Sequence, residues 1–251
     1  MRRILVWVVL LAVCGCGEER RSPALGAMEH ESAAPARDRP TEVEMVASME
    51  AHYSAVILAH DALVRGDLEK FRSQLALVPE QALPPSAPEE WLPLHRRIQA
   101  AAREAANASD LTTAATTIAS VVLACGICHA ALDTGPVYPA PAPDDGADAV
   151  KNAMLDHQWL TERLWEGVTG PWNNAWERGA DALSVVKVFG EENLAVALST
   201  DLLQREQELR EIGEKAKNAT ALDERAALYG RLLATCGECH QAVEVTIEPP
   251  K

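Results

Sequence analysis

The chain has 251 residues, of which 48% are hydrophobic and 24% charged, enough apolar side chain for a packed core in one or two domains. Aromatic residues are only 4% and the mean hydropathy is -0.09, which excludes a collagen and a membrane protein with several spans. The net charge of -14 at pH 7 argues against binding to nucleic acid or to an anionic lipid surface.

Residues 1–16 have the features of an export signal. Two arginines precede the apolar run Ile4–Val13, which is too short to span a bilayer as a helix but matches a signal-peptide core. Cys16 follows a small glycine and fits a bacterial lipobox better than Cys14, which follows a valine. We therefore expect a membrane-anchored lipoprotein in the periplasm of a Gram-negative bacterium, with lipid on Cys16. Cleavage without lipidation is the alternative.

Two further stretches divide the rest of the chain. Residues 17–40 are charged, contain Ala and Pro, and lack an apolar period, so we expect a disordered tether. Residues 134–147 contain four prolines and two glycines and are predicted to be a linker. The segments 41–133 and 148–245 remain as the folded domains.

The segment 41–133 has the period of packed helices. Apolar residues recur at steps of three and four near its start and near its end, which indicates two helices with a narrow core-facing seam. These residues are Met49, His52, Val56, Ala59 and Leu63, and then Leu111, Ala115, Ile118, Val122, Cys125, His129 and Leu132. The proline-containing stretch 79–88 is a predicted break, and 89–106 is a further predicted helix.

The segment 148–245 repeats the first one. Its end matches residues 111 positions earlier, as Cys236 matches Cys125, and its start matches residues 105 positions earlier, as His157 matches His52. Helices are predicted over 174–188 and 191–217, after a break at Gly170-Pro171. No strand pattern occurs. We expect a tandem duplication with an all-α fold of two four-helix bundles, each carrying the motif below on its last helix.

The repeated motif is Cys-x-x-Cys-His. It occurs as Cys125, Cys128 and His129, and again as Cys236, Cys239 and His240. This is the pattern of c-type haem attachment. On a helix, residues i and i+3 present two thiols along one side of a macrocycle, for thioether bonds to its vinyl groups. The imidazole at i+4 lies on the same face as i and reaches the iron. The motifs predict two covalently attached haem c groups, with His129 and His240 as iron ligands.

Other uses of these cysteines are possible from the sequence. Exported proteins favour structural disulfides, so two small disulfide loops are one alternative. A zinc site would have to bridge more than 100 residues between the two motifs, unlike compact zinc motifs. A thioredoxin-like redox site needs no histidine after the second cysteine and lies in a βαβ context that is missing here.

A four-helix bundle with the attachment motif on its last helix resembles the class II cytochromes c, the cytochrome c prime family and its low-spin relatives. The resemblance covers about residues 41–133 and 148–245 and depends on the place of the motif. It implies either a five-coordinate iron beneath a bulky apolar residue of the first helix, or a methionine ligand from that helix. This sequence departs from both patterns by placing a Met–His pair in each first helix.

The Met–His pairs supply candidate sixth ligands. His52 and His157 occupy equivalent positions on the predicted seams, and we expect them to complete two bis-histidine haems. Met49 and Met154 are the alternative distal ligands, although methionine is also adaptable core filler. His60 and His95 have no counterpart in the other repeat, so surface or ordinary packing is expected for both.

The function predicted from these features is transfer of single electrons between periplasmic redox partners. Two closed haems leave no site for a substrate, so an electron carrier is favoured over an enzyme. The acidic chain favours redox partners that are basic at the contact. We expect no binding to nucleic acid, and contact with a membrane only through the lipid anchor. An open iron would instead favour a gas-binding or sensing protein, and a diheme peroxidase would further need a distal base.

Overall fold

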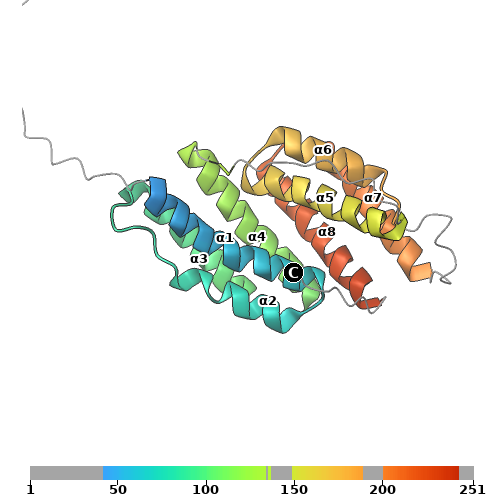
Figure 1. Cartoon of the computed structure of the whole chain (residues 1–251), viewed down its shortest axis with the longest axis horizontal. Helices are drawn as coiled ribbons and strands as arrows, with labels where there is room; N and C mark the ends of the chain where they lie inside the picture. Colours follow the sequence, from blue (N-terminus) through green and yellow to red (C-terminus); the bar gives the residue numbers. More distant parts are fainter. Residues whose placement is uncertain (1–41, 134, 137–148, 189–199, 243–251) are drawn as a thin grey trace, which may run out of the picture. The chain divides into compact units, whose positions relative to one another are not determined.

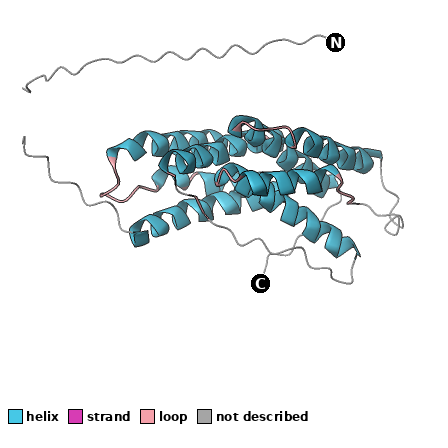
Figure 2. Ribbon diagram, turned by 90° about the horizontal axis from the view of Figure 1, so that it is seen from above, coloured by secondary structure: helices cyan, strands magenta, loops and turns pink. Residues whose placement is uncertain are grey.

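The computed structural model is all-α, as the sequence predicts. It describes residues 42–133, 135–136, 149–188 and 200–242, and within these ranges it contains eight α-helices, two short 3-10 helices and no strand (Figures 1 and 2). The structure does not test three of the predicted segments, because they lie wholly or almost wholly outside the described residues. These are the signal 1–16, the tether 17–40 and the linker 134–147.

The first half of the chain forms four helices. They are α1 (Glu42–Val64), α2 (Leu68–Leu75), α3 (Leu92–Ala105) and α4 (Leu111–Leu132), with 3-10 turns at Val78–Glu80 and Glu89–Trp91. Side-chain caps start two of these helices, because Asp67 accepts from the Lys70 N–H and Asp110 accepts from the Thr113 N–H. The predicted break over 79–88 separates α2 from α3, and the predicted helix 89–106 is α3 with the 3-10 turn before it.

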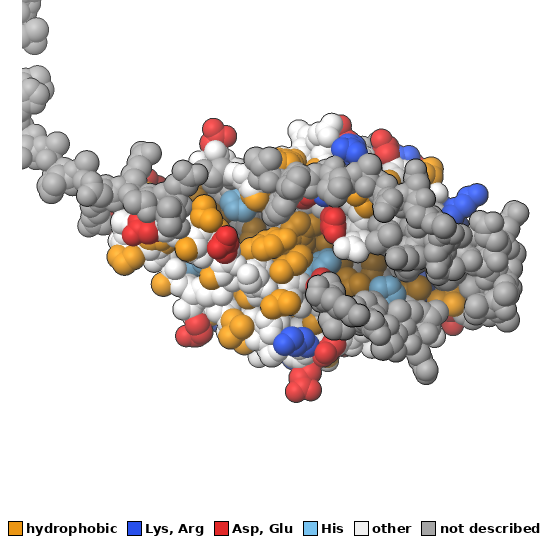
Figure 3. All heavy atoms as spheres, viewed as in Figure 1, with side chains coloured by type: hydrophobic (Ala, Val, Ile, Leu, Met, Phe, Trp, Pro, Cys, Tyr) orange, Lys and Arg blue, Asp and Glu red, His pale blue; other side chains and the backbone are white. Residues whose placement is uncertain are grey.

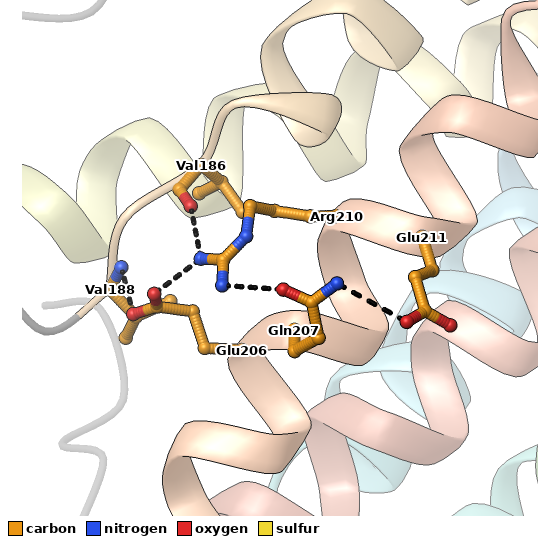
Figure 4. A network of polar contacts seen from close by, with 6 residues as sticks. All are labelled: Val186, Val188, Glu206, Gln207, Arg210 and Glu211. Atoms are coloured by element: carbon orange, nitrogen blue, oxygen red, sulfur yellow. Dashed lines mark hydrogen bonds and ion pairs between the residues drawn. The ribbon is translucent and has the colours of Figure 1, made fainter.

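The second half also forms four helices. They are α5 (Ala149–Thr169), α6 (Asn173–Ser184), α7 (Thr200–Ala216) and α8 (Leu222–Ala242). The helix predicted over 174–188 is too long, since α6 ends at Ser184. Beyond this point the backbone bonds to α7: the Val188 N–H donates to Glu206 at 3.0 Å, and Val186 accepts from Arg210 at 3.3 Å (Figure 4). The helix predicted over 191–217 is described from Thr200 onward.

The predicted seams face the core. The apolar residues of both halves belong to one continuous hydrophobic cluster, which includes Val56, Leu63, Ile118, Leu164 and Leu233. The two last helices, α4 and α8, lie side by side between the other helices and make the most extensive interhelical contact (Figure 1). The two halves of the described chain therefore share a core.

The helices α4 and α8 cross closely and run antiparallel. Leu111 at the start of α4 lies near Gly237, and Leu222 at the start of α8 lies near Gly126. At the crossing point, a Cβ on Gly230 would lie 2.9 Å from the carbonyl oxygen of Ala115 and 2.9 Å from the Ala119 Cβ. Small residues thus allow the two backbones to approach. The antiparallel direction places the motif of α4 and the motif of α8 at opposite ends of the pair.

By length and composition alone, α4 could cross a membrane, with a mean hydropathy of 1.8 in its most apolar window. Half of that window is buried inside the structure, and α4 packs against α3, α5 and α8. Its apolar character is that of a central core helix, for which burial on several sides is expected.

An aromatic cluster joins the halves near the middle of the molecule. The hydroxyl of Tyr229 in α8 forms a hydrogen bond of 2.9 Å with His60 Nε2 in α1, and the ring of Trp165 in α5 packs edge-on against both rings. The Tyr229 side chain is buried, and this burial raises the pKa of its hydroxyl. A buried hydroxyl without an acceptor is costly, so this bond helps to hold α1 on α8.

We expect a double-mutant cycle on Tyr229→Phe and His60→Leu to give a coupling free energy of about 1 kcal/mol in urea unfolding. His60→Leu should be the more destabilising single change, because it leaves a buried hydroxyl unpaired, whereas Tyr229→Phe removes the hydroxyl itself. A coupling energy near zero would show that the bond contributes nothing to the contact between the halves.

Candidate functional site

Both Cys-x-x-Cys-His motifs lie in the C-terminal part of a core helix. The α4 motif comprises Cys125, Cys128 and His129, and the α8 motif comprises Cys236, Cys239 and His240. The four cysteines are free thiols. Because each motif is fully helical, its first cysteine and its histidine share one helix face, as the spacing predicts.

Each motif histidine is anchored by a main-chain carbonyl of the opposite half. His129 Nδ1 lies 2.6 Å from the oxygen of Thr169, and His240 Nδ1 lies 2.7 Å from the oxygen of Val64. A carbonyl oxygen only accepts, so Nδ1 carries the proton, and a neutral ring then has its lone pair on Nε2. Thr169 and Val64 are themselves equivalent, 105 positions apart, so the same bond forms twice.

The carbonyl acceptors have a simple structural origin. Val64 is the last residue of α1 and Thr169 is the last residue of α5. The last carbonyls of a helix have no partner within the helix, and they carry the negative end of its dipole. An imidazole N–H is a suitable donor to such a group. The helix ends therefore fix which nitrogen of each motif histidine is left free.

Glycine in the motif makes this contact possible. Gly126 and Gly237 follow the first cysteine of each motif, and both are buried. A Cβ on Gly237 would lie 2.9 Å from the Leu63 carbonyl oxygen, and a Cβ on Gly126 would overlap the Val168 carbonyl oxygen. The end of the first helix in one half thus lies directly on the motif of the other half, and only a residue without a side chain leaves room.

The motif thiols are not activated. Burial, with a smaller contribution from the neighbouring thiols Cys128 and Cys239, raises the pKa of Cys125 and of Cys236 to about 12. Burial also raises the pKa of Cys128 and of Cys239. Redox-active dithiol sites instead lower the pKa of at least one thiol, so these motifs differ from a thioredoxin-like centre.

The motifs also do not meet to form a shared metal centre. Within the described parts of the chain, no group of three or more His, Cys, Asp or Glu side chains could hold a metal ion. One motif lies against the end of α5 and the other against the end of α1. The bridging zinc site weighed from the sequence is therefore not formed by the described residues.

In the second half, the first helix brings a histidine toward the motif. Burial, with a smaller contribution from positive charge on His240, lowers the pKa of His157 to about 4 despite the opposing effect of the Glu206 carboxylate, so the ring is neutral near pH 7. The Nε2 atom of His157 is buried and has no hydrogen-bond partner. Buried ring nitrogens normally have a hydrogen-bond partner. A buried histidine nitrogen without one, close to His240, is typical of a side chain that binds a metal.

In the first half, the equivalent histidine has a partner. His52 Nε2 lies 3.3 Å from His95 Nε2, and His52 Nδ1 lies 2.9 Å from the carbonyl oxygen of Ser48. Both rings are buried, which lowers the pKa of both histidines. His95 was not distinguished by the sequence pattern, because Glu206 stands at its place in the second half.

The alternative distal ligands are less well defined. Met49 lies in α1, one turn before His52, and is partly buried. Met154 lies in α5, but its side chain is outside the described part of the structure. Its role as a ligand or as core packing therefore stays a prediction. On the face shown in Figure 3, histidine side chains lie among exposed hydrophobic side chains.

The donor atoms present fit a c-type haem. Each motif offers two thiols and an imidazole whose Nε2 lone pair is kept free, and the second half adds the neutral imidazole of His157, with a buried, unpartnered Nε2, close to His240. No protein-family model, no curated protein and no solved structure matches the chain. The interpretation of the site therefore depends on its own chemistry.

Replacing Gly126 by Ala is expected to destabilise the protein by about 1–3 kcal/mol, because two backbones would have to separate. Helix propensity alone predicts the opposite sign, a gain of about 1 kcal/mol. Ser120→Ala, at an exposed position of α4, is the control and should change the stability by less than about 0.5 kcal/mol. The measurement is urea unfolding, and a stabilised Gly126→Ala protein would contradict the close contact.

Proposed function

We propose that this chain is an exported diheme c-type cytochrome that passes single electrons between periplasmic redox partners. The first haem is held by thioether bonds to Cys125 and Cys128, with His129 on its iron. The second is held by Cys236 and Cys239, with His240 on its iron. The two halves are duplicated four-helix bundles of the class II type, fused along α4 and α8.

One observation carries this proposal. Both motif histidines donate Nδ1–H to a main-chain carbonyl, at 2.6 Å in one half and 2.7 Å in the other. Metal-binding histidines are characteristically oriented by a hydrogen bond from the ring nitrogen that does not bind the metal. A disulfide or dithiol role for the cysteines gives no reason for the histidine to be held in this way, twice, at equivalent places.

The protein's contribution to electron transfer is to hold the ligands and exclude water. When bound, haem supplies a reversible one-electron change at its iron. The carbonyls of Val64 and Thr169 fix the ring orientation and increase the basicity of the proximal imidazoles, which favours the oxidised iron. The buried apolar residues of the core-facing seams keep water away from the proposed haem sites. Rigid packing of this kind suits rapid electron transfer, because the site then changes little in geometry when it gains an electron.

His157 is the residue that would complete the coordination of the second haem iron. Its Nε2 atom is buried, has no other partner, and belongs to a ring near His240. Ligation would satisfy this nitrogen, whose burial without a partner otherwise costs about 1–3 kcal/mol. A closed second haem has no position for a substrate, which supports electron transfer over catalysis at that site.

The location and the charge fit such a carrier. Covalent attachment suits an exported protein, because a lost cofactor is hard to replace outside the cytoplasm. The net charge of -14 favours a redox partner with a basic contact surface and an association rate that falls as salt is added. A lipid on Cys16 would keep the protein at the membrane where such partners work.

Expression in the periplasm together with a cytochrome c maturation system should give two haems per chain. The haem content is measured by the pyridine haemochrome spectrum and by intact mass after denaturation. Cys125→Ala/Cys128→Ala and Cys236→Ala/Cys239→Ala should each leave one covalent haem. A chain that matures without any covalent haem, beside a control cytochrome that is loaded, would overturn the proposal.

Cys16→Ser is expected to move the protein from the membrane fraction to the soluble periplasmic fraction, because the acylated residue is lost. Cys14→Ser is the matched control and should leave the protein in the membrane. Immunoblots of the separated fractions provide the measurement. Equal release by both variants, or by neither, would show that Cys16 is not the lipidated residue.

A further inference from the structure

The first helices of the two halves contact each other through a pair of equivalent residues. His60 of α1 and Trp165 of α5 stand 105 positions apart, the offset that relates the starts of the two repeats. Their rings pack edge to face, with centroids 5.4 Å apart and an interplanar angle of 70°. The tandem repeat therefore brings one position into contact with its own counterpart.

On one side of this contact, Trp165 is connected to the motif of α4. It lies one helical turn, or about 6 Å along the axis, before Thr169. The Thr169 hydroxyl donates to the Trp165 carbonyl at 2.9 Å, and the Thr169 carbonyl oxygen lies 2.6 Å from His129 Nδ1. A continuous run of covalent and hydrogen bonds thus joins Trp165 to the imidazole of His129.

On the other side of the contact, His60 is connected to the motif of α8. It lies one helical turn before Val64, the last residue of α1. The Val64 carbonyl oxygen lies 2.7 Å from His240 Nδ1. A second run of covalent and hydrogen bonds thus joins His60 to the imidazole of His240, and the two runs meet where the His60 and Trp165 rings touch.

The aromatic rings at this contact do more than fill the core. The Trp165 side chain is 6% exposed, and its Nε1 is buried without a hydrogen-bond partner. Burying such a group is unfavourable, and an aliphatic side chain would fill the same region without that cost. Aromatic residues make up only 4% of the chain, yet Trp165 and Tyr229 both lie against His60. The sequence therefore keeps rings together at the point where the two runs of bonds meet.

We propose that electrons pass between the two haems of one chain through the contact of Trp165 with His60. This inference deepens the proposed function and depends on it. In each transfer one electron leaves the reduced haem and enters the oxidised haem, so that one iron is oxidised and the other is reduced. No bond forms or breaks, and no proton moves. Trp165 and His60 are positioning residues, because each acts on a haem only through a motif histidine.

The spacing of the two motifs suits transfer within one chain. Near the start of α5, His157 senses the charge of His240, and at the end of α5, Thr169 contacts His129. The helix between positions 157 and 169 is about 18 Å long. Electron tunnelling falls off with distance, and it falls faster across gaps between atoms than along covalent and hydrogen bonds. A route with a single contact between side chains is therefore favoured over one with several.

The test uses the full chain matured in the periplasm. The haem content is measured first, so that a chain without two haems contradicts the proposed function and is separated from a failure of this inference. The haem methyl resonances are then followed by NMR through a reductive titration, and their line shapes give the rate of electron exchange in the half-reduced protein. Where the two potentials differ too much for this, pulse radiolysis measures the rate at which an added electron redistributes.

In the unaltered protein, the exchange rate should not depend on protein concentration, because the transfer is intramolecular. Trp165→Leu and His60→Leu should each reduce this rate. The double variant should be no slower than the slower single variant, because both changes remove the same contact. Two independent routes would instead give losses that multiply.

Two variants serve as matched controls. Trp159→Leu removes a tryptophan of the same helix, α5, whose ring lies against Arg163 and Arg178, and it should leave the exchange rate unchanged. Tyr229→Phe removes the hydrogen bond to His60 but keeps the ring, so it should also leave the rate unchanged. The second control separates a loss of stability from a loss of the route.

The inference would be overturned by exchange that depends on protein concentration, or by losses that multiply in the double variant. It would also be overturned if Trp165→Leu left the rate unchanged or slowed it no more than Trp159→Leu. The electrons would then follow another path, along α5 or between α4 and α8. If the leucine variants do not fold, Trp165→Phe takes their place and should reduce the rate to a smaller extent. The concentration dependence of the unaltered protein decides the matter without any variant.

Discussion

The arrangement of both sites depends on the contact between a motif helix and the end of the first helix from the opposite half. The last carbonyls of α1 and α5 lack partners in their own helices, and the imidazoles of His240 and His129 satisfy them. Glycine within each motif lets the backbones approach closely enough for this bond. Neither half provides both the histidine and its acceptor, so the antiparallel packing of α4 on α8 is a requirement for two correctly oriented motif histidines.

The surroundings of the two motif histidines are alike, since each donates to the last carbonyl of a helix from the opposite half. The surroundings of His52 and His157 differ, because the equivalent positions 95 of α3 and 206 of α7 carry different residues. His95 pairs with His52, whereas Glu206 pairs with Arg210 and the backbone at Val188. Equivalent positions on two supporting helices thus take different partners, while the repeated motif itself is unchanged.

The helices, their core-facing seams and the two motifs could be predicted from the sequence, because each leaves a periodic or repeated pattern. The contacts that orient the motif histidines could not, since Val64 and Thr169 act through main-chain carbonyls and any side chain supplies one. His95 escaped prediction for a related reason: it has no counterpart in the second half. The end of α6 at Ser184 was also not predictable, because its backbone partners, Glu206 and Arg210, lie on a helix that follows later in the chain.

The matched proximal bonds have a consequence for the redox properties of the proposed cytochrome. A stronger acceptor at Nδ1 makes an imidazole a stronger donor to iron and lowers the reduction potential. The two acceptors are the same kind of helix-terminal carbonyl at nearly the same distance, 2.6 and 2.7 Å, so this factor shifts both haems alike. Any difference in potential between the two haems would then come from the other factors that set it, namely the remaining axial ligand, burial and nearby charge.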